Sequence, residues 1–337
     1  MMRTLLILLS ILALAGCATP FVQPAMAPPP GFTGPRIEAP TLVGTPGAFV
    51  VEDGARLPFL RWGPAEPVIV IVALHGMNDY SAAFHLAGPA WAEQGIATYA
   101  YDQRGFGRAP GRGLWAGEAR MTQDLRTVVA LVRTRHPGAL IAVAGESMGG
   151  AVAISAFASE APPAADRLIL LAPAVWGWSS QSLPNRAALW IAARAFGDRA
   201  VEPPDWAVRD IRATDNLIQL IRNGTDPGFI RTTRFDALSG LVDLMESAAE
   251  KLGRVRAPTL LMYGARDDII EQRPMRLALE QAGGPHNLRT AWYPQGYHLL
   301  NRDLQATVVY RDVEAWLRNP VDPLPSGAPQ VLQNLSE

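Results

Sequence analysis

The chain alternates short apolar runs with segments in which apolar residues recur at helical spacing. Apolar runs, several of them bounded by Gly or Pro, predict eight strands at residues 48–52, 57–62, 68–74, 96–101, 140–144, 168–171, 259–263 and 288–293. Helical spacing predicts helices at residues 81–94, 121–135, 148–159, 273–281 and 303–317. This alternation is typical of an α/β fold, with a mostly parallel eight-stranded sheet covered by helices on both faces.

Residues 173–248 interrupt the alternation after the sixth strand. They contain no convincing strand. Helical patterns fit 187–196, 215–222 and 235–249, and aromatic residues are scattered among these patterns, including Trp176, Trp178, Trp190, Trp206 and Phe229. We therefore expect one domain at 48–318 with an inserted helical segment. Residues 17–47, rich in Pro and Gly, predict an extended tether, and 319–337 an irregular tail.

A candidate nucleophile follows the fifth predicted strand. The sequence there is Gly145-Glu146-Ser147-Met148-Gly149-Gly150, a G-x-S-x-G pattern between a strand and a helix. Small residues two positions before and after the serine allow a sharp turn that exposes its hydroxyl at the end of the strand. A serine nucleophile also needs a base, and the base needs an orienting group.

Two histidines follow Ser147 in the sequence. His286 lies in a polar loop, whereas His298 follows the last predicted strand and precedes the last helix, where it can meet Ser147. We therefore expect His298 to be the base. The acid should follow the preceding strand, and Asp267 and Asp268 both stand there.

Several motifs occur in the order of a known family. His75-Gly76-Met77-Asn78 follows the third strand, the loop from Tyr101 to Gly107 reads Y-D-Q-R-G-F-G, and the G-x-S-x-G turn follows. Over about residues 45–318 the chain resembles α/β-hydrolases of the monoacylglycerol lipase and lysophospholipase type, which are grouped with serine aminopeptidases. The resemblance maps the family's G-x-x-D-x-[IVL] motif onto Gly264, Asp267 and Ile269, and so favours Asp267 as the acid.

The resemblance also implies further roles. The backbone amides of Met77 and Met148 would form the oxyanion hole, and His75 would brace its loop. The insertion at about 173–248 would be a cap over the serine, with Trp176 and Trp178 as candidate acyl contacts. No metal or organic cofactor is implied.

Composition narrows the partners. The chain has 337 residues, a formal net charge of −1 and 49% hydrophobic residues, without the basic excess that nucleic-acid binding requires. The one cysteine, Cys17, allows neither an internal disulfide nor a cysteine-based zinc site. Oligomeric state is not readable from these features.

The N-terminus predicts export. A basic start and an apolar run at 5–15 lead to Leu14-Ala15-Gly16-Cys17, which resembles a bacterial lipobox. Residues 1–16 would then be a lipoprotein signal peptide, and lipidated Cys17 would anchor the protein to a membrane, with sorting to the outer membrane facing the periplasm. Ordinary cleavage and a secreted or periplasmic soluble protein remain the alternative.

The main expectation is a serine hydrolase that cleaves a monoacylglycerol- or lysophospholipid-like ester. A serine aminopeptidase is the alternative, and would need a carboxylate patch such as Glu202, Asp205 and Glu246 for the free amine. A non-catalytic, envelope-anchored binding protein is the alternative of another class.

Overall fold

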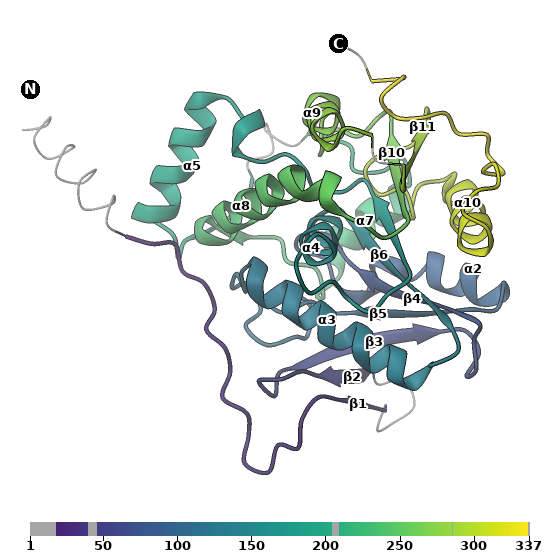
Figure 1. Cartoon of the computed structure of the whole chain (residues 1–337). Helices are drawn as coiled ribbons and strands as arrows, with labels where there is room; N and C mark the ends of the chain where they lie inside the picture. Colours follow the sequence, from purple (N-terminus) through teal and green to yellow (C-terminus); the bar gives the residue numbers. More distant parts are fainter. Residues whose placement is uncertain (1–17, 40–45, 204–208, 285, 336–337) are drawn as a thin grey trace, which may run out of the picture.

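The computed structural model describes residues 18–39, 46–203, 209–284 and 286–335. Its centre is a nine-stranded sheet in the order β1-β2-β3-β5-β4-β6-β7-β10-β11 (Figure 1). The strands are β1 (Arg36–Glu38), β2 (Gly47–Val50), β3 (Arg56–Trp62), β4 (Ile69–Leu74), β5 (Ile96–Tyr101), β6 (Leu140–Glu146), β7 (Arg167–Leu171), β10 (Thr259–Gly264) and β11 (Leu288–Tyr293). The pairs β1–β2, β2–β3 and β3–β5 are antiparallel, and every pair from β5 to β11 is parallel.

The predicted α/β architecture is confirmed, but the expected number of strands was wrong. All eight predicted strands lie in the sheet, and β1 adds a ninth from within the predicted tether. Its three residues, Arg36 to Glu38, pair with β2 through the backbone, and their side chains are exposed or half-buried. A short edge strand of this kind has no apolar run, so hydrophobic patterning could not reveal it.

Helices cover both faces of the sheet. On one face lie α3 (Glu118–Arg135), α4 (Met148–Phe157) and α9 (Gln272–Ala282), and on the other lie α2 (Ala87–Glu93) and α10 (Ala306–Arg318). Each face has its own apolar cluster: Leu125 and Val129 of α3 belong to the first, and Trp91 and Trp316 to the second. The predicted helix at 81–94 is divided into a 3-10 turn η1 (Ser81–Phe84) and α2.

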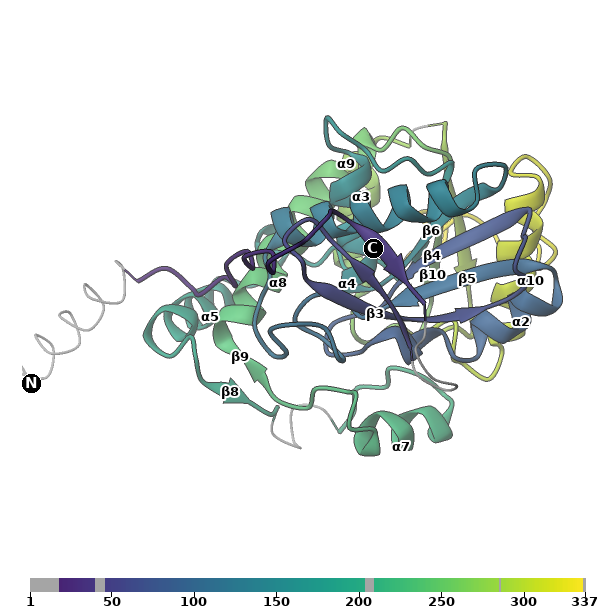
Figure 2. The same ribbon diagram turned by 90° about the horizontal axis from the view of Figure 1, so that it is seen from below.

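The insertion after β7 contains more than helices. Its elements are η2 (Trp178–Ser180), α5 (Leu183–Ala195), β8 (Ala200–Val201), α7 (Leu217–Thr225), β9 (Thr233–Arg234), α8 (Phe235–Lys251) and η3 (Leu252–Arg254). Strands β8 and β9 form a two-stranded antiparallel sheet, which their two-residue length hid from the sequence pattern. Figure 2 shows α5, β8, β9 and α7 grouped along one side of the molecule.

Helix α8 belongs with the body, although the predicted cap at 173–248 included almost all of it. It packs against α4 and leads through η3 into β10, so it is the crossover helix before that strand. Ala237, Leu244 and Ala248 of α8 are buried in the same apolar cluster as α3 and α4. The sequence pattern could not separate α8 from the cap because both are helical.

Both Pro- and Gly-rich ends, in their described parts, pack on the domain. The amide of Gln23 donates to the carbonyl of Trp115 at 2.7 Å, and the amide of Met26 donates to Asp53 Oδ2 at 2.9 Å. At the other end, the amide of Trp292 in β11 donates to the carbonyl of Pro329 at 2.8 Å, and Val331 is fully buried. Within the predicted tether, hydrogen bonds from the backbone amides of Gln23 and Met26 therefore hold an irregular segment to the body.

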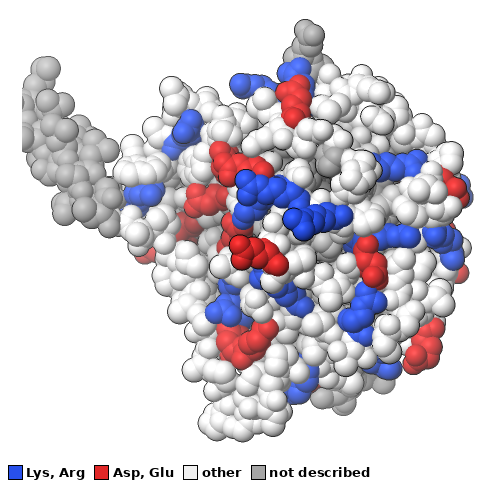
Figure 3. All heavy atoms as spheres, viewed as in Figure 1, with Lys and Arg blue, Asp and Glu red and all other residues white. Residues whose placement is uncertain are grey.

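The described surface mixes charges of both signs. Figure 3 shows acidic and basic side chains lying among one another on one face. In the described part of the chain, no helix combines the length and the apolar character needed to span a bilayer.

Candidate active site

Ser147 occupies a strained turn between β6 and α4. Its backbone has φ 51° and ψ −118°, in a region that residues with a Cβ rarely adopt. Its amide donates to the carbonyl of Leu171 at 3.0 Å, and its carbonyl accepts from the amide of Ala174 at the same distance. Glu146 and Met148 are buried on either side, but Ser147 is only partly buried. The turn therefore exposes one hydroxyl within an otherwise buried segment.

Two glycines make this turn possible. A Cβ on Gly145 would lie 2.5 Å from the carbonyl oxygen of Gly149, and one on Gly149 would lie 2.4 Å from the carbonyl oxygen of Leu74. Both contacts are with backbone, which cannot move aside cheaply. The G-x-S-x-G spacing thus reflects the close approach of β4, β6 and α4.

His298 and Asp267 are brought together at the ends of neighbouring strands. His298 lies in the turn after β11, and Asp267 lies in the turn after β10. The His298 Nδ1 atom is 2.8 Å from Asp267 Oδ2, and both side chains are buried. The other oxygen of Asp267 accepts the amides of Ile269 and Ile270, each at 2.8 Å. These two bonds hold the carboxylate in a single orientation.

Asp268 and His286, the alternatives to Asp267 and His298, are both exposed. Asp268 is exposed and accepts the amide of Arg212 at 3.2 Å. His286 is exposed, in the loop before β11. Of these alternatives, only Asp267 contacts His298 within the described residues.

The charge environment favours the protonated ring of His298. Burial alone would lower its pKa, but the nearby carboxylates of Asp267 and Glu146 outweigh burial, and the pKa is raised above the usual 6.5. A histidine with a raised pKa is a stronger proton acceptor once it is neutral.

Two backbone amides belong to segments that adjoin Ser147. Met148 begins α4 directly after Ser147, and Met77 follows the Gly76 whose Cβ position would lie 3.2 Å from the Cβ of Ser147. Among the described residues, neither amide has an assigned hydrogen-bond acceptor. Both amides are thus available to a ligand oxygen near the serine.

His75 fixes the loop that carries Met77. Its Nδ1 atom lies 2.7 Å from the carbonyl oxygen of Gly76, and its Nε2 atom accepts the amide of Gln103 at 3.0 Å. Full burial is the largest influence on the ring, and the pKa of His75 is lowered. The neutral imidazole makes one hydrogen bond through each ring nitrogen and so joins the loop of Gly76 to the loop of Gln103.

A buried ion network that the sequence motifs did not reveal includes the residue directly before Ser147. Arg302 contacts both Asp79 and Glu146, and all three side chains are buried. Glu146 directly precedes Ser147, and Arg302 follows His298 by four residues. Glu146 lies within the G-x-S-x-G motif and Arg302 lies near His298, which was a signal that the sequence offered. No sequence pattern, however, indicates that these two charges form a pair.

The candidate cap residues have partners of their own. Trp178 Nε1 donates to Asp243 Oδ1 of α8 at 2.6 Å, and Trp178 lines a groove with Leu183 and Trp190 of α5. Trp176 is half-buried and packs against the apolar cluster of α3 and α4. Neither Ser147 nor His298 lines that groove.

Of the carboxylates considered for a free amine, Glu202 and Glu246 lie within the described residues. Glu246 Oε2 accepts both the amide and the hydroxyl of Ser179 at 2.9 Å, and Glu202 is exposed. Asp205 and Cys17 lie outside the described residues. Among those described, no three His, Cys, Asp or Glu side chains are grouped as metal ligands would be.

The comparisons with known proteins identify the family and the fold. Residues 65–305 match the family described as serine aminopeptidase, S33 (Hydrolase_4), over more than half of the chain. The chain belongs to this family. A monoacylglycerol lipase from Mycolicibacterium smegmatis is 25% identical over 280 residues, which cover 80% of this chain and 95% of that protein.

Solved structures show the same fold. A monoacylglycerol lipase from Paleococcus ferrophilus superposes with a TM-score of 0.65 at 19% identity, covering 77% of this chain and 98% of its own. A soluble variant of the Saccharomyces cerevisiae monoglyceride lipase, in complex with a substrate analog, has a TM-score of 0.66 at 18% identity, with coverages of 90% and 100%. The protein is thus an α/β-hydrolase, distantly related to monoacylglycerol lipases.

The His298–Asp267 contact leads to a prediction about titration. Asp267→Asn should lower the pKa of His298, because removal of the adjacent negative charge favours the neutral ring. Asp268→Asn, an identical change one residue away on an exposed side chain, should leave that pKa close to its original value. NMR titration of the histidine ring signals, with His298→Gln to assign them, measures both. Equal pKa values in the two variants would contradict the assignment of Asp267.

Proposed function

We propose that this protein is a serine hydrolase that cleaves carboxylic esters, with Ser147 as nucleophile, His298 as base and Asp267 as its orienting group. The observation that carries the proposal is the 2.8 Å contact between buried His298 and Asp267, in a hydrolase fold whose strained turn exposes Ser147. These three residues follow β6, β10 and β11, whose carboxyl ends lie at one edge of the sheet. No metal or cofactor takes part in the proposed reaction.

The proposed reaction forms an acyl-enzyme and then hydrolyses it. Because Nδ1 of His298 faces Asp267, Nε2 is the nitrogen that takes the proton from Ser147 Oγ as the oxygen attacks the ester carbon. The resulting oxyanion would be bound by the amides of Met77 and Met148. His298 then returns its proton to the departing alcohol, which leaves an acyl-Ser147. Water activated by His298 releases the acid and restores the serine.

The proposed substrate is a monoacylglycerol- or lysophospholipid-like ester. Its support is the relationship to a monoacylglycerol lipase along almost the whole length of that relative, together with the aromatic residues of the cap. Trp176 and Trp178 are the proposed contacts for the acyl chain. The serine aminopeptidase reaction has less support, because Glu246 is already engaged with Ser179.

The proposed location is the cell envelope, through a lipid on Cys17. Its support is the lipobox-like sequence Leu14-Ala15-Gly16-Cys17. Membrane attachment would bring the enzyme to esters held in a bilayer.

The nucleophile is tested by Ser147→Ala. Loss of the hydroxyl should reduce turnover of p-nitrophenyl acetate by about 10⁴- to 10⁶-fold, because triad members act as a unit. Ser155→Ala provides the matched control, since Ser155 is a buried serine on α4. The control should keep its turnover. Near-normal activity of Ser147→Ala in a clean preparation would refute the mechanism, and absence of activity in the unmodified protein would favour a non-catalytic binding protein.

The substrate class is tested with p-nitrophenyl esters of increasing acyl length. The kcat/KM should rise by up to about fourfold per added CH₂, equivalent to about 0.8 kcal/mol, and then level off where the apolar wall ends. Trp176→Gln or Trp178→Gln should shorten the rise and leave acetyl ester turnover nearly intact. A flat profile, together with a preference for aminoacyl anilides, would instead support the aminopeptidase.

The anchor is tested by Cys17→Ser in the full-length chain. The substitution should abolish labelling by a fatty-acid probe and release the protein from membrane fractions, because acyl chains contribute about 0.8 kcal/mol per buried CH₂. Turnover of a soluble ester should be unchanged. A soluble, unmutated protein that begins beyond Cys17 would show ordinary secretion.

A further inference from the structure

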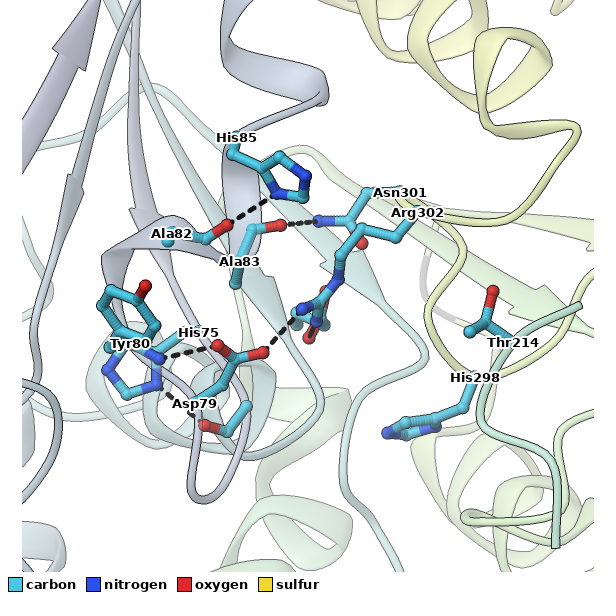
Figure 4. A network of polar contacts seen from close by, with 12 residues as sticks. His75, Asp79, Tyr80, Ala82, Ala83, His85, Thr214, His298, Asn301 and Arg302 are labelled. Atoms are coloured by element: carbon cyan, nitrogen blue, oxygen red, sulfur yellow. Dashed lines mark hydrogen bonds and ion pairs between the residues drawn. The ribbon is translucent and has the colours of Figure 1, made fainter. Parts of the chain in front are cut away.

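A single guanidinium joins two carboxylates from different loops. Arg302 Nη1 lies 2.6 Å from Asp79 Oδ2, and Nη2 contacts Glu146 Oε1. Arg302 is 2% exposed, and both acids are also buried. Figure 4 shows the Arg302 side chain directed toward Asp79. We call these three residues the Arg302 cluster.

Each member of the cluster belongs to a segment with a part in the proposed reaction. Asp79 follows Met77 by two residues, in the loop after β4. Glu146 is the last residue of β6, directly before Ser147. Arg302 follows His298 by four residues, and its amide donates to the carbonyl of Leu299 at 2.7 Å. The cluster therefore ties together the oxyanion loop, the nucleophile turn and the histidine loop.

Stability alone is a weak reason for such a cluster. Burying three charged groups carries a large desolvation cost, and apolar replacements of buried ion networks are often neutral or stabilising. The cluster is also incompletely paired: among the described residues, Glu146 Oε2 and Arg302 Nε are buried without a hydrogen-bond partner. Unpaired polar atoms in a buried network lower the free energy of unfolding. A purely structural role therefore does not explain the cluster.

The cluster also acts on the base through charge. Glu146 and Arg302 are the two members of the cluster whose charge acts on His298. Glu146 favours the protonated imidazole, whereas Arg302 opposes it. A negative charge behind the serine turn would stabilise the imidazolium that forms as Ser147 attacks.

We propose that Arg302 is a positioning residue that clamps the three active-site loops together through Asp79 and Glu146. The proposal rests on the ester hydrolase function proposed above. A fork-shaped guanidinium can reach two carboxylates in fixed directions, which the single ammonium of a lysine cannot do. Arg302 thereby holds the Met77 amide, Ser147 and His298 at the separations that the reaction requires.

The principal test is Arg302→Lys, which keeps the buried charge but loses the fork. With p-nitrophenyl acetate, kcat should fall by about 10- to 100-fold, as expected for a small misplacement of reacting groups, while KM stays close to its original value. Arg104→Lys is the matched control. Arg104 is equally buried and pairs with Asp53 and Asp124, which lie outside the three loops. It should lose thermal stability but keep kcat.

A second variant reports on charge. Glu146→Gln keeps the shape and an acceptor oxygen, and should move the acid limb of the kcat/KM profile to lower pH because it lowers the pKa of His298. The clamp is overturned if Arg302→Lys keeps its kcat, if Arg104→Lys loses as much, or if the acid limb of Glu146→Gln does not move.

A fluorophosphonate probe separates the two proposals, since its rate of labelling depends on an activated serine and on no particular ester. Slower labelling of Arg302→Lys than of the unmodified protein supports the clamp. Equal labelling of the two refutes the clamp and leaves the hydrolase function standing. If the unmodified protein is not labelled, the hydrolase function fails, and the clamp fails with it.

Discussion

The positive φ of Ser147 is the constraint on which the rest of this site depends. That conformation costs conformational free energy, so contacts with the surrounding structure must stabilise it. The surroundings are β4, β6 and α4, whose backbones approach so closely that Gly145 and Gly149 leave no room for a Cβ. The exposure of the Ser147 hydroxyl thus depends on both the order of the strands and the positions of the glycines.

The order of the sheet then decides which other loops reach Ser147. Strands β4 and β7 flank β6, and β10 and β11 follow in the same parallel direction, so their carboxyl ends share one edge. Polar residues that follow these strands meet there, although Met77 and His298 are separated by most of the domain in sequence. The antiparallel strands β1 to β3 lie at the far side and only extend the sheet.

Two kinds of buried polar contact hold these loops. The first is neutral: His75 braces Gly76 and Gln103. The second is ionic: Asp267 faces His298, and Arg302 faces Asp79 and Glu146. In a medium of low polarity such charges act strongly on one another, which explains why the pKa of His298 is raised despite its burial. The same contacts that orient the loops therefore set the proton affinity of His298.

The sequence by itself determined the elements and the candidate chemistry. Apolar runs located the eight longer strands, since strands covered on both faces are apolar throughout, and helical spacing located most helices. The G-x-S-x-G spacing located the turn because only small residues fit it. Tertiary structure alone decided the ninth strand, the docking of the ends, the place of α8 and the Arg302 cluster. Each of these features depends on hydrogen bonds or charges from distant segments. Such contacts leave no apolar run or helical spacing in the sequence. Burial of an element follows from the apolar residues of that element, which the sequence displays. Hydrogen bonds and ion pairs between distant segments form only after the sheet has brought its loops together.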